Sequence, residues 1–488
     1  MPVRKPDLLI NVDSGSSIPL YQQVFEEIRK LILNGALVEG EKLPPIRKLT
    51  KSLGVSHATI ERAYLQLSVE GYVQNMPRSG YTVNRIDISY FDQHDDLNIR
   101  DEVQRVLAGL PKNPLQEEIA AGAAARYNFS YCNLQPGSFP RKTWIQLTNE
   151  VVKKSTDEEL SSYWCHEGPS RLHVQLAHYL QQARGVVCEP EQIVFQSGTE
   201  AMLNSIVHLF IGRIGCIGHE EPGYEVMTAI GQRFPGATLA PLPVTCGAAG
   251  FLDALDEHKP RLVFTTPSHQ FPTGKVMPLE TRIRLLQWAQ ANDAYIIEDD
   301  SCNEYRYNTQ AIPSLQSLDR HNRVIYICNF SKALSPGLRI AYAVLPPELL
   351  GRWHRLFTMS WDPMPYITRE TLASFIEQGH WAQHLRKMAA DNKRRHDLLV
   401  ECLQKEFGDK VELSGLDSGM HLYVTVKNGM TQQELIESAR RRGAAVHGTD
   451  QYWFSQDAPQ NTVLVGFSAI SYEDIPSGVE VLRRAWFK

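Results

Sequence analysis

From residue 192 onward, short runs of β-branched and aromatic residues alternate with amphipathic stretches of helical length. The apolar runs include QIVFQSG, RLVFTTPSH, AYIIEDD and RVIYICNFSK, and EAMLNSIVHLF and LETRIRLLQWAQ are two of the stretches that follow them. Parallel strands need a long crossover connection, usually a helix, and such helices bury both faces of the sheet. The alternation therefore predicts an α/β fold with a mostly parallel sheet flanked by helices.

The chain has 488 residues, which is too many for one ordinary core, so two or three domains are expected. A hydrophobic content of 43% and a charged content of 22% are typical of a soluble globular protein. The N-terminus, MPVRKPDLLI, lacks the apolar segment of a signal peptide, and no apolar run is long enough to span a membrane. The scattered cysteines form no CxxC pair. These features predict a cytoplasmic protein with reduced cysteines and no metal site.

Charge is distributed unevenly along the chain. The net charge of −5 argues by itself against nucleic-acid binding. However, the first 85 residues carry 11 Lys and Arg against 8 Asp and Glu, whereas the rest carries 39 against 47. This distribution indicates that only the N-terminal region meets DNA.

The N-terminal region reads as three helices followed by a hairpin. PLYQQVFEEIRKLILNG gives the first helix, and LPPIRKLTKSLGVSHATIERAYLQLSVEGYV gives two more, separated by a glycine-containing turn. Ser56 is predicted as the N-cap of the third helix, whose first turns carry His57, Thr59 and Arg62. A recognition helix meets base edges and phosphates with such residues. The alternative is a small helical module for protein interaction.

The hairpin GYVQNMPRSGYTV has Arg78, Ser79 and Gly80 at its tip and can serve as a wing. In its order of elements this region resembles the GntR-type winged helix-turn-helix. The resemblance implies that promoter DNA is contacted by Arg47, Ser56, His57, Thr59, Arg62, Arg78, Ser79 and Gly80. His57 stands where the family usually has arginine, so the base preference of relatives does not carry over.

Lys332 lies just after the apolar run RVIYIC, near the carboxyl end of a predicted strand, where α/β folds place ligands. Asn329 and Ser331 offer small polar groups beside it, and Arg339 offers a fixed charge. An amine held beside an arginine tends to lose its proton, and the neutral amine is the form that condenses with an aldehyde. We therefore interpret Lys332 as a nucleophile.

Three carboxylates, Glu298, Asp299 and Asp300, end the run YIIEDD. They allow two interpretations: a Mg²⁺ site or solvated strand end, or a carboxylate partner for the pyridinium nitrogen of an electron-sink cofactor. In QSGTEAM, a glycine turn between strand and helix offers backbone N–H groups to a phosphate. Tyr224, in EEPGYEV, is suited to stacking on a flat ring.

Taken in order, these motifs resemble the fold-type I aminotransferases that use pyridoxal 5′-phosphate (PLP), and with the GntR-type region they resemble the MocR subfamily of regulators. The resemblance implies a winged helix-turn-helix at residues 1–83, a linker at 84–126, and an aminotransferase-like part at 127–488. The last part is expected to comprise a large domain at about 127–350 and a small α+β domain at about 351–488.

The resemblance implies that Lys332 forms a Schiff base with PLP, that Asp299 pairs with the pyridine nitrogen in preference to Asp300, and that Tyr224 stacks on the ring. The other cofactor contacts that it implies are Ser197, Gly198, Thr199, Glu200, Ser331, Arg339, Asn329 and Tyr163. Tyr163 resembles the tyrosine that relatives lend to the neighbouring subunit's phosphate site. A head-to-tail homodimer with shared sites is therefore expected.

Three positions depart from the aminotransferase pattern. Phe271 replaces the asparagine that touches the phenolic oxygen of the cofactor, and Ser301 replaces a tyrosine that serves the same oxygen in many MocR regulators. His269 or Gln270 is an alternative partner for that oxygen. In NTVLVGF, Leu464 replaces the arginine that clamps a substrate carboxylate, so an ordinary α-amino acid is expected to bind poorly.

The implied function is a PLP-dependent transcriptional regulator. In this hypothesis, PLP on Lys332 senses an amine, an amino compound or PLP itself and thereby alters promoter binding. Two alternatives stay open: an active aminotransferase with a DNA-binding head, and a regulator that has lost PLP and keeps the second part only for dimerisation.

Overall fold

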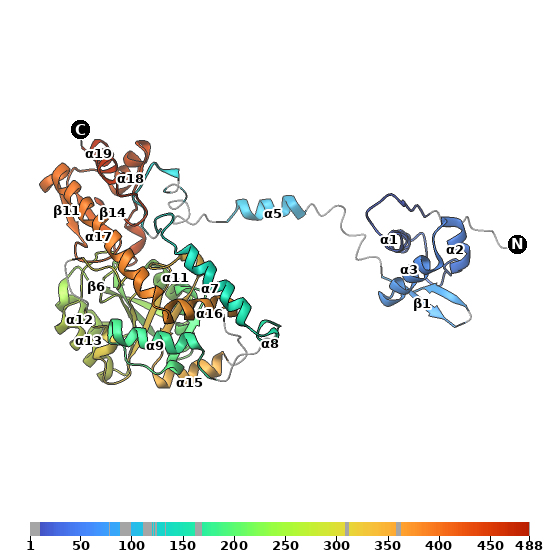
Figure 1. Ribbon diagram of the computed structural model, residues 1–488, viewed down its shortest axis with the longest axis horizontal. Helices are drawn as coiled ribbons and strands as arrows, with labels where there is room; N and C mark the ends of the chain where they lie inside the picture. Colours follow the sequence, from blue (N-terminus) through green and yellow to red (C-terminus); the bar gives the residue numbers. More distant parts are fainter. Residues whose placement is uncertain are drawn as a thin grey trace. The chain divides into compact units, whose positions relative to one another are not determined.

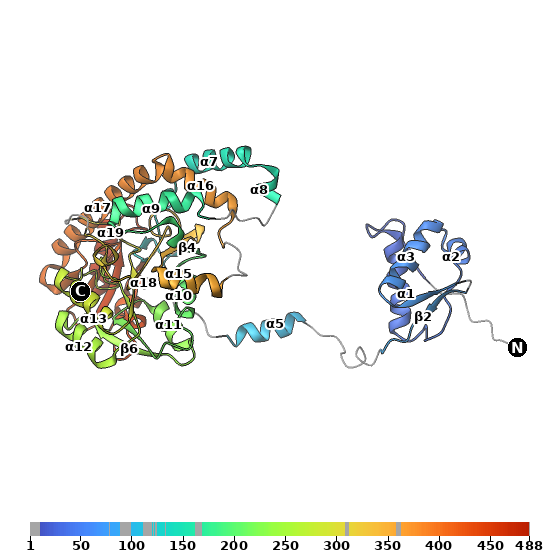
Figure 2. The ribbon, with the colours of Figure 1, turned by 90° about the horizontal axis from the view of Figure 1, so that it is seen from below.

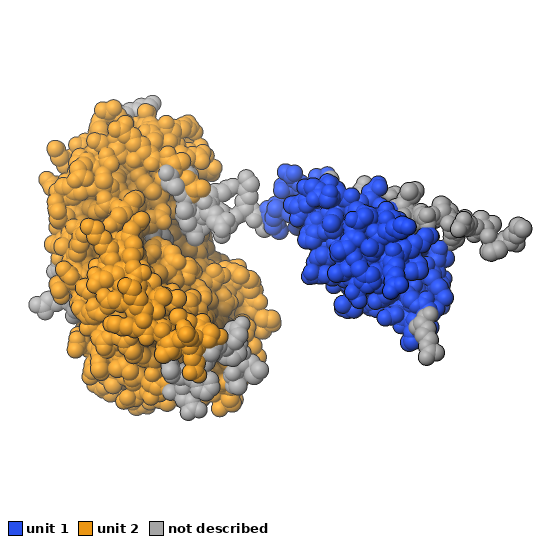
Figure 3. Space-filling view, turned by 45° about the vertical axis from the view of Figure 1, so that its right-hand side comes forward, with its two compact units in different colours: residues 1–111 blue, residues 112–488 orange. Residues whose placement is uncertain are grey.

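The computed structural model describes residues 10–77, 79–87, 99–110, 120, 122, 124–131, 133–161, 168–307, 312–357 and 363–487. The chain divides into two compact units, residues 1–111 and residues 112–488, coloured separately in Figure 3.

The first unit contains three helices followed by a two-stranded antiparallel hairpin (Figure 1): α1 (Leu20–Leu33), α2 (Ile46–Leu53), α3 (His57–Val69), β1 (Val73–Met76) and β2 (Gly80–Val83). Its core is built by apolar residues at helical spacing on α1 and α3, namely Val24, Phe25, Ile28, Ile32, Ile60, Ala63, Tyr64 and Leu67. This order of elements is that of a winged helix-turn-helix. The fold predicted for the N-terminal region is therefore confirmed.

The turn between α2 and α3 has the local chemistry that a helix-turn-helix requires. Gly54 ends α2 in the left-handed conformation with φ 66°, which glycine adopts without steric cost. The Ser56 hydroxyl then accepts a hydrogen bond of 3.1 Å from the Thr59 N–H. The predicted N-cap of α3 is thus confirmed. Further along, the stretch predicted as a linker contains helix α5 (Ile99–Ala108).

The second unit contains a seven-stranded sheet in the order β4-β10-β9-β8-β7-β5-β6. The strands are β4 (Ile193–Gln196), β5 (Cys216–Glu221), β6 (Thr238–Pro243), β7 (Leu262–Thr265), β8 (Tyr295–Asp299), β9 (Val324–Asn329) and β10 (Ala341–Val344). The pairings from β9 through β8, β7 and β5 to β6 are all parallel, whereas β10 pairs antiparallel with β9 and β4. The predicted mostly parallel sheet is confirmed.

Helices cover both faces of this sheet. Successive residues of a strand point to opposite faces, so neighbouring residues join different cores. On β8, Ile297 joins a core with α10 (Thr199–His208), α11 (Glu225–Arg233) and α15 (Pro347–Leu356). Its neighbour Ile296 joins a different core. The helices of that second core are α12 (Gly247–His258) and α13 (Leu279–Ala291).

A third core lies over the β4, β9 and β10 end of the sheet. Its helices are α7 (Arg141–Lys154), α9 (Arg171–Arg184) and α16 (Tyr366–Glu377), and α16 packs against the other two (Figure 2). The short helices α8 (Asp157–Ser161) and α14 (Leu315–Leu318) lie in connecting segments.

A separate core belongs to the C-terminal part of the unit. Its antiparallel sheet has the order β11 (Val411–Ser414), β12 (His421–Val426) and β14 (Thr462–Gly466). The helices that contribute to this core are α17 (His380–Phe407), α18 (Gln432–Arg441) and α19 (Ile475–Trp486). The combination of a large α/β layer with a smaller α+β layer is the predicted fold class, which is confirmed.

The first described strand of the second unit is part of this C-terminal core. Strand β3 (Tyr127–Asn128) pairs in parallel with β13 (Ala444–Ala445), and the buried Phe129 ring belongs to the same core. The Phe129 N–H donates to the Ala445 carbonyl at 3.0 Å, and the Phe129 carbonyl accepts from the Gly466 N–H at 2.7 Å. The segment that enters the second unit is therefore fastened to the C-terminal layer.

Candidate functional site

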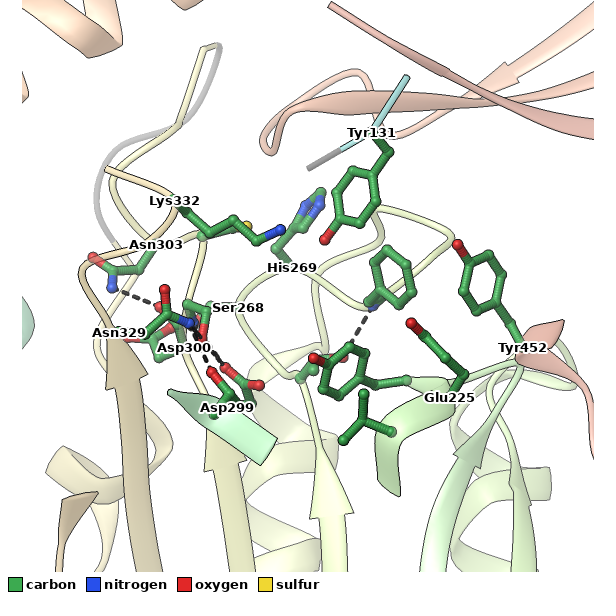
Figure 4. Close-up of a pocket in the computed structure, with 17 residues that line it drawn as sticks. Tyr131, Glu225, Ser268, His269, Asp299, Asp300, Asn303, Asn329, Lys332 and Tyr452 are labelled. Carbon is green, nitrogen blue, oxygen red and sulfur yellow. Dashed lines mark hydrogen bonds between the residues drawn. The ribbon is translucent and has the colours of Figure 1, made fainter. Parts of the chain in front are cut away.

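A cavity of about 160 Å³ lies at the carboxyl ends of β7, β8 and β9, the edge at which open α/β sheets bind ligands. Five of the predicted cofactor residues line it: Lys332, Asp299, Tyr224, Thr199 and Asn329. The C-terminal part contributes Tyr452, and the segment after β3 contributes Tyr131 (Figure 4). The cavity is therefore closed by residues from three regions that are far apart in the sequence.

Lys332 is half-buried and extends into the cavity toward Tyr131 (Figure 4). Its Nζ atom lies 4.4 Å from the centre of the Tyr131 ring, a distance at which an ammonium group is attracted to the ring face. The Lys332 carbonyl accepts a hydrogen bond of 2.8 Å from the Tyr305 hydroxyl. The backbone of the lysine is thus held while its side chain reaches the ligand space.

The three carboxylates at the end of β8 have three different sets of partners. Glu298 accepts from the backbone N–H groups of Leu315 and Gln316, at the start of α14. Asp300 forms a buried ion pair with Arg184, with a distance of 2.7 Å between Nε and Oδ2. Among the described residues, no group of three or more acidic, histidine or cysteine side chains is arranged to hold a metal ion.

Asp299 and Asp300 line the cavity, whereas Glu298 does not. Of these two, Asp299 is the one for which the described residues show no ion pair. Its Oδ1 atom accepts from the Ser301 N–H at 3.0 Å and from the Ser301 hydroxyl. Burial raises the pKa of Asp299 from its ordinary 3.8 to about 6, although the Ser301 hydrogen bonds and the nearby Lys332 charge act in the opposite direction. A cationic ring nitrogen placed against this group would favour its ionised form.

The raised pKa of Asp299 predicts a pH-dependent change in stability for the protein stripped of pyridoxal compounds. Between pH 3.8 and 6 the unfolded chain ionises this carboxyl while the folded chain keeps it protonated, so its contribution to stability falls as the pH rises. We expect the free energy of unfolding of the wild type, relative to Asp299→Asn, to fall by about 3 kcal/mol across this window. Denaturant unfolding of both proteins at several pH values checks this. A difference that stays constant or grows would contradict it.

The residues predicted to hold a phosphate gather around the N-terminus of α10. Gly198 precedes this helix with φ 98°, and an added Cβ there would lie 2.3 Å from Nη2 of Arg339. The Asn329 side-chain amide donates to the Thr199 hydroxyl at 3.0 Å, and the Ser331 N–H donates to the Asn329 oxygen at 2.9 Å. A helix N-terminus with an adjacent guanidinium is a suitable anion site.

Ser197 and Glu200, which flank this turn, are exposed, as is Arg339. Tyr163 lies outside the described residues. Tyr224 is half-buried at the N-cap of α11, and its ring stacks at 6.3 Å on that of Phe264. The structure thus brings most of the predicted cofactor residues to one edge of the sheet.

Two of the three positions that depart from the aminotransferase pattern, Phe271 and Leu464, lie in an apolar and aromatic cluster. Phe271, Tyr452 and Leu464 are buried together, with Tyr131 and Tyr224 packed against them. Leu464 has no exposed surface, so no cation occupies its position beside Tyr423 on the paired strand. The position at which the resemblance implies a lost carboxylate clamp is thus packed with hydrocarbon.

Ser301, His269 and Gln270 differ in the hydrogen bonds that their side chains already make. The Ser301 hydroxyl links Asp299 to the Asn329 amide, from which it accepts at 2.8 Å. The Gln270 amide is engaged elsewhere, because it donates to the Pro222 carbonyl at 2.8 Å and accepts from Thr273. Of the two alternatives, His269 is the one that lines the cavity, with Nδ1 2.8 Å from the Ser418 hydroxyl.

Burial holds the nearby imidazoles in the neutral form. It lowers the pKa of His269 from 6.5 to about 3 and that of His421 to about 4. His421 also lies close to His269, with ring centres 5.6 Å apart, and its Nε2 lies 2.8 Å from the Pro272 carbonyl. Neither imidazole therefore brings a positive charge to this side of the cavity.

The cavity residues that were not predicted from the sequence include Tyr131, Glu225 and Tyr452. Glu225 directly follows the predicted Tyr224, and this position in the sequence could have indicated that it lies near the cavity. Tyr131 and Tyr452 lie in segments without a strand-end pattern, so no such indication existed for them. The importance of Arg184 was also missed, because its partner Asp300 is 116 residues away.

In the first unit, most candidate DNA contacts are exposed: Arg47, Ser56, His57, Arg62, Ser79 and Gly80. The Arg62 guanidinium lies 4.0 Å from the centre of the Tyr21 ring, and His57 lies 3.7 Å from the Glu61 carboxylate. Thr59 is half-buried because it interacts with the Ser56 cap. Arg78 lies outside the described residues.

Comparison with known proteins identifies both units. The family of bacterial regulatory proteins named gntR matches residues 20–83, and the aminotransferase class I and II family matches residues 131–451. The structure resembles that of LysN, an α-aminoadipate aminotransferase from Thermus thermophilus solved with N-(5′-phosphopyridoxyl)-L-leucine. The TM-score is 0.67 with 22% identity, over 82% of this chain and 98% of LysN. Fold and site thus define a GntR-type DNA-binding domain fused to an aminotransferase-like domain of fold type I.

Full-length relatives show the same fusion. The chain is 35% identical to the uncharacterized HTH-type transcriptional regulator YdeL of Bacillus subtilis, over 96% of this chain and 97% of YdeL. It is 31% identical to the probable rhizopine catabolism regulatory protein MocR of Rhizobium meliloti, over 98% of this chain and 96% of MocR. The chain belongs to the MocR-type family of HTH transcriptional regulators. None of the helices in the described residues is long and apolar enough to cross a membrane.

Proposed function

We propose that this regulator holds PLP as a Schiff base on Lys332 and responds to an amine by changing how it binds promoter DNA. The observation that carries the proposal is the placement of Lys332 and Asp299 on one cavity, which Thr199 also lines at the start of α10, next to Gly198 and the Arg339 guanidinium. A reactive lysine, a carboxylate for a ring nitrogen and a phosphate cradle are the three groups that PLP requires. When bound, PLP supplies an aldehyde that exchanges one primary amine for another.

The side chains around the cavity fit this cofactor. Gly198 leaves space for the Arg339 guanidinium, which a Cβ would fill, so a phosphate at the start of α10 would meet backbone N–H groups and a fixed cation. Asp299 is buried in a position where an unpaired negative charge is costly, which a protonated ring nitrogen would relieve. Tyr224 lines the same cavity and offers a ring face to the cofactor.

The absence of a carboxylate clamp favours amines over α-amino acids as effectors. Phe271 and Tyr452 line the cavity, and the buried Leu464 packs against them at the position where the resemblance to aminotransferases implies an arginine. A carboxylate buried against such surface loses its hydration without gaining a charged partner. This argument favours a sensor over an aminotransferase that acts on ordinary amino acids.

We further propose that the chain works as a head-to-tail homodimer in the cytoplasm, with Tyr163 lent to the partner's phosphate site. The amine changes DNA binding only if it binds the DNA-binding-competent and incompetent states with different affinity. Arg47, Ser56, His57, Thr59, Arg62, Arg78, Ser79 and Gly80 are the proposed DNA contacts.

Titration of the visible spectrum tests the proposal. The full chain reconstituted with PLP is expected to show an absorbance band that borohydride reduction removes and fixes to Lys332. Phenethylamine is expected to shift the band at concentrations roughly tenfold or more below those needed for phenylalanine, because the carboxylate of phenylalanine lacks a charged partner. Equal responses to the two compounds would contradict the proposed selectivity. Rapid turnover of phenylalanine with a keto acid would instead favour the aminotransferase alternative.

A further inference from the structure

We infer that the amine recognised in this cavity carries a second cationic group, and that Glu225 binds it. This inference rests on the proposed function, since it assigns the ligand class of the same cavity. The inference starts from the Glu225 carboxylate, which lines the cavity in addition to Asp299 and Asp300. Glu225 lies on α11, and Tyr224 is the one predicted cofactor contact next to that helix in the sequence.

Glu225 is the first residue of α11 and directly follows Tyr224. Its side chain extends into the cavity on the side of Tyr452, away from Asp299 (Figure 4). The residue is half-buried, and its Oε2 atom is out of contact with solvent. A charge in such a position is screened much less than a surface charge, so a matching cation gains more from it.

Aromatic rings line the same region. The ring of Phe271 lies 5.1 Å from that of Tyr131 and 4.8 Å from that of Tyr452, measured between centres. The Tyr224 ring lies 6.2 Å from Phe271. Ring faces attract alkylammonium groups, and a carboxylate beside several rings forms a site for a cation on an apolar stem. The rings also bury the methylene groups that join the two amines of such a ligand.

The charges of the cavity point to the same ligand class. Among the described residues that line the cavity, Lys332 is the only lysine or arginine, against the carboxylates of Glu225, Asp299 and Asp300. Asp300 is neutralised by Arg184, and Asp299 faces the position proposed for the ring nitrogen. Glu225 is the carboxylate that lines the cavity from α11. An effector with its own carboxylate would face this charge and the aromatic rings of Phe271 and Tyr452.

Glu225 also has a possible structural role, because an acidic residue in the first turn of a helix interacts favourably with the helix dipole. That role affects the stability of the protein for every ligand equally. Ligand recognition instead affects the ratio of affinities between a diamine and a monoamine. The two roles are therefore separable by measuring that ratio.

The test uses the full chain reconstituted with PLP and four compounds of equal chain length: cadaverine, pentylamine, 5-aminopentanol and 5-aminopentanoate. Binding is measured by calorimetry and by the visible spectrum. We expect cadaverine to bind roughly tenfold or more tightly than pentylamine and 5-aminopentanol, with 5-aminopentanoate the weakest, because one charge-assisted contact in a partly buried site has about this effect. A series of linear diamines then locates the preferred spacing between the two nitrogens.

Glu225→Gln keeps the shape of the side chain and is expected to reduce the preference for cadaverine over pentylamine to about twofold or less, with pentylamine affinity retained. Glu257→Gln, on the exposed surface of α12, is the matched control and should keep the wild-type ratio. Glu225→Lys should reverse the order so that 5-aminopentanoate binds more tightly than cadaverine. A folding defect cannot produce this reversal.

The inference is overturned if cadaverine, pentylamine and 5-aminopentanoate bind the wild type equally, or if Glu225→Gln keeps the wild-type ratio. Either result leaves the proposed function intact so long as the visible band forms and responds to amines. Absence of the band in the reconstituted wild type would overturn the proposed function itself. The spectrum of the unliganded protein thus separates the two failures.

Discussion

Lys332→Ala is expected to eliminate the borohydride-fixable chromophore and to abolish effector-dependent control of the promoter, while the N-terminal unit stays folded. The reason is chemical: the ε-amine of Lys332 is the lysine amine that lines the cavity, and the Tyr305 contact holds its backbone in place. Without that amine, PLP loses its covalent attachment and the ligand loses the group that it displaces. The absorbance spectrum and a reporter fused to a promoter bound by the tagged protein in cells provide the two measurements.

Two variants sharpen this experiment. Lys332→Arg keeps a cation beside Tyr131 but cannot form the Schiff base, so it should behave like Lys332→Ala. Lys153→Ala, on the exposed surface of α7, should behave like the wild type. Unchanged effector-dependent control in Lys332→Ala would refute the sensing role of the lysine. Loss of control in Lys332→Ala but not in Lys332→Arg would show that charge, and not the covalent bond, matters.

Arg184→Met is expected to lower the free energy of unfolding of the second unit by about 3 to 5 kcal/mol, because it leaves Asp300 buried without its counter-ion. Arg184 and Asp300 are 3% and 1% exposed, and the guanidinium also donates to the Ile312 carbonyl at 2.6 Å and the Ser268 hydroxyl at 2.9 Å. The Asp300 charge raises the pKa of Arg184, although burial alone would lower it. Denaturant unfolding followed by far-ultraviolet circular dichroism provides the measurement.

The control for this substitution is Arg213→Met, at an exposed arginine between α10 and β5, which should change stability by less than about 0.5 kcal/mol. The double variant Arg184→Met with Asp300→Asn removes the uncompensated charge and should recover part of the loss. If Arg184→Met unfolds at the same denaturant concentration as the wild type, the ion pair does not stabilise this end of the sheet. Since Asp300 adjoins Asp299, the same variant should also weaken PLP binding.

The architecture was predictable because local patterns and the global fold agree. The alternation of apolar runs with amphipathic stretches predicted a mostly parallel sheet, and the Gly54 turn with the Ser56 cap predicted the helix-turn-helix. The reversed direction of β10 was not predicted, because AYAV is as apolar as its parallel neighbours and carries no sign of strand direction. Strand direction depends on the connections between strands, which the pattern of single residues does not encode.

In the site, motifs at strand ends identified Lys332, Asp299 and Tyr224, because strand ends in parallel sheets meet at one edge. The sequence also indicated that Leu464 removes a carboxylate clamp, but not that Phe271 and Tyr452 pack against it. That cluster joins a loop after β7 to the C-terminal part, and such a contact follows only from the folded arrangement. Glu225 was passed over because a glutamate in the first turn of a helix is common for reasons unrelated to ligands.

Strand β3 is where the chain coming from the DNA-binding unit joins the second unit, and this strand pairs with β13 of the C-terminal part and not with the seven-stranded sheet. Tyr452, which faces the ligand cavity, belongs to that same C-terminal part. If ligand binding rotates the C-terminal part, residue 127 at the start of β3 would therefore move with it. In the proposed function, such a rotation would reach the chain that leads to the DNA-binding unit through the paired strands β3 and β13.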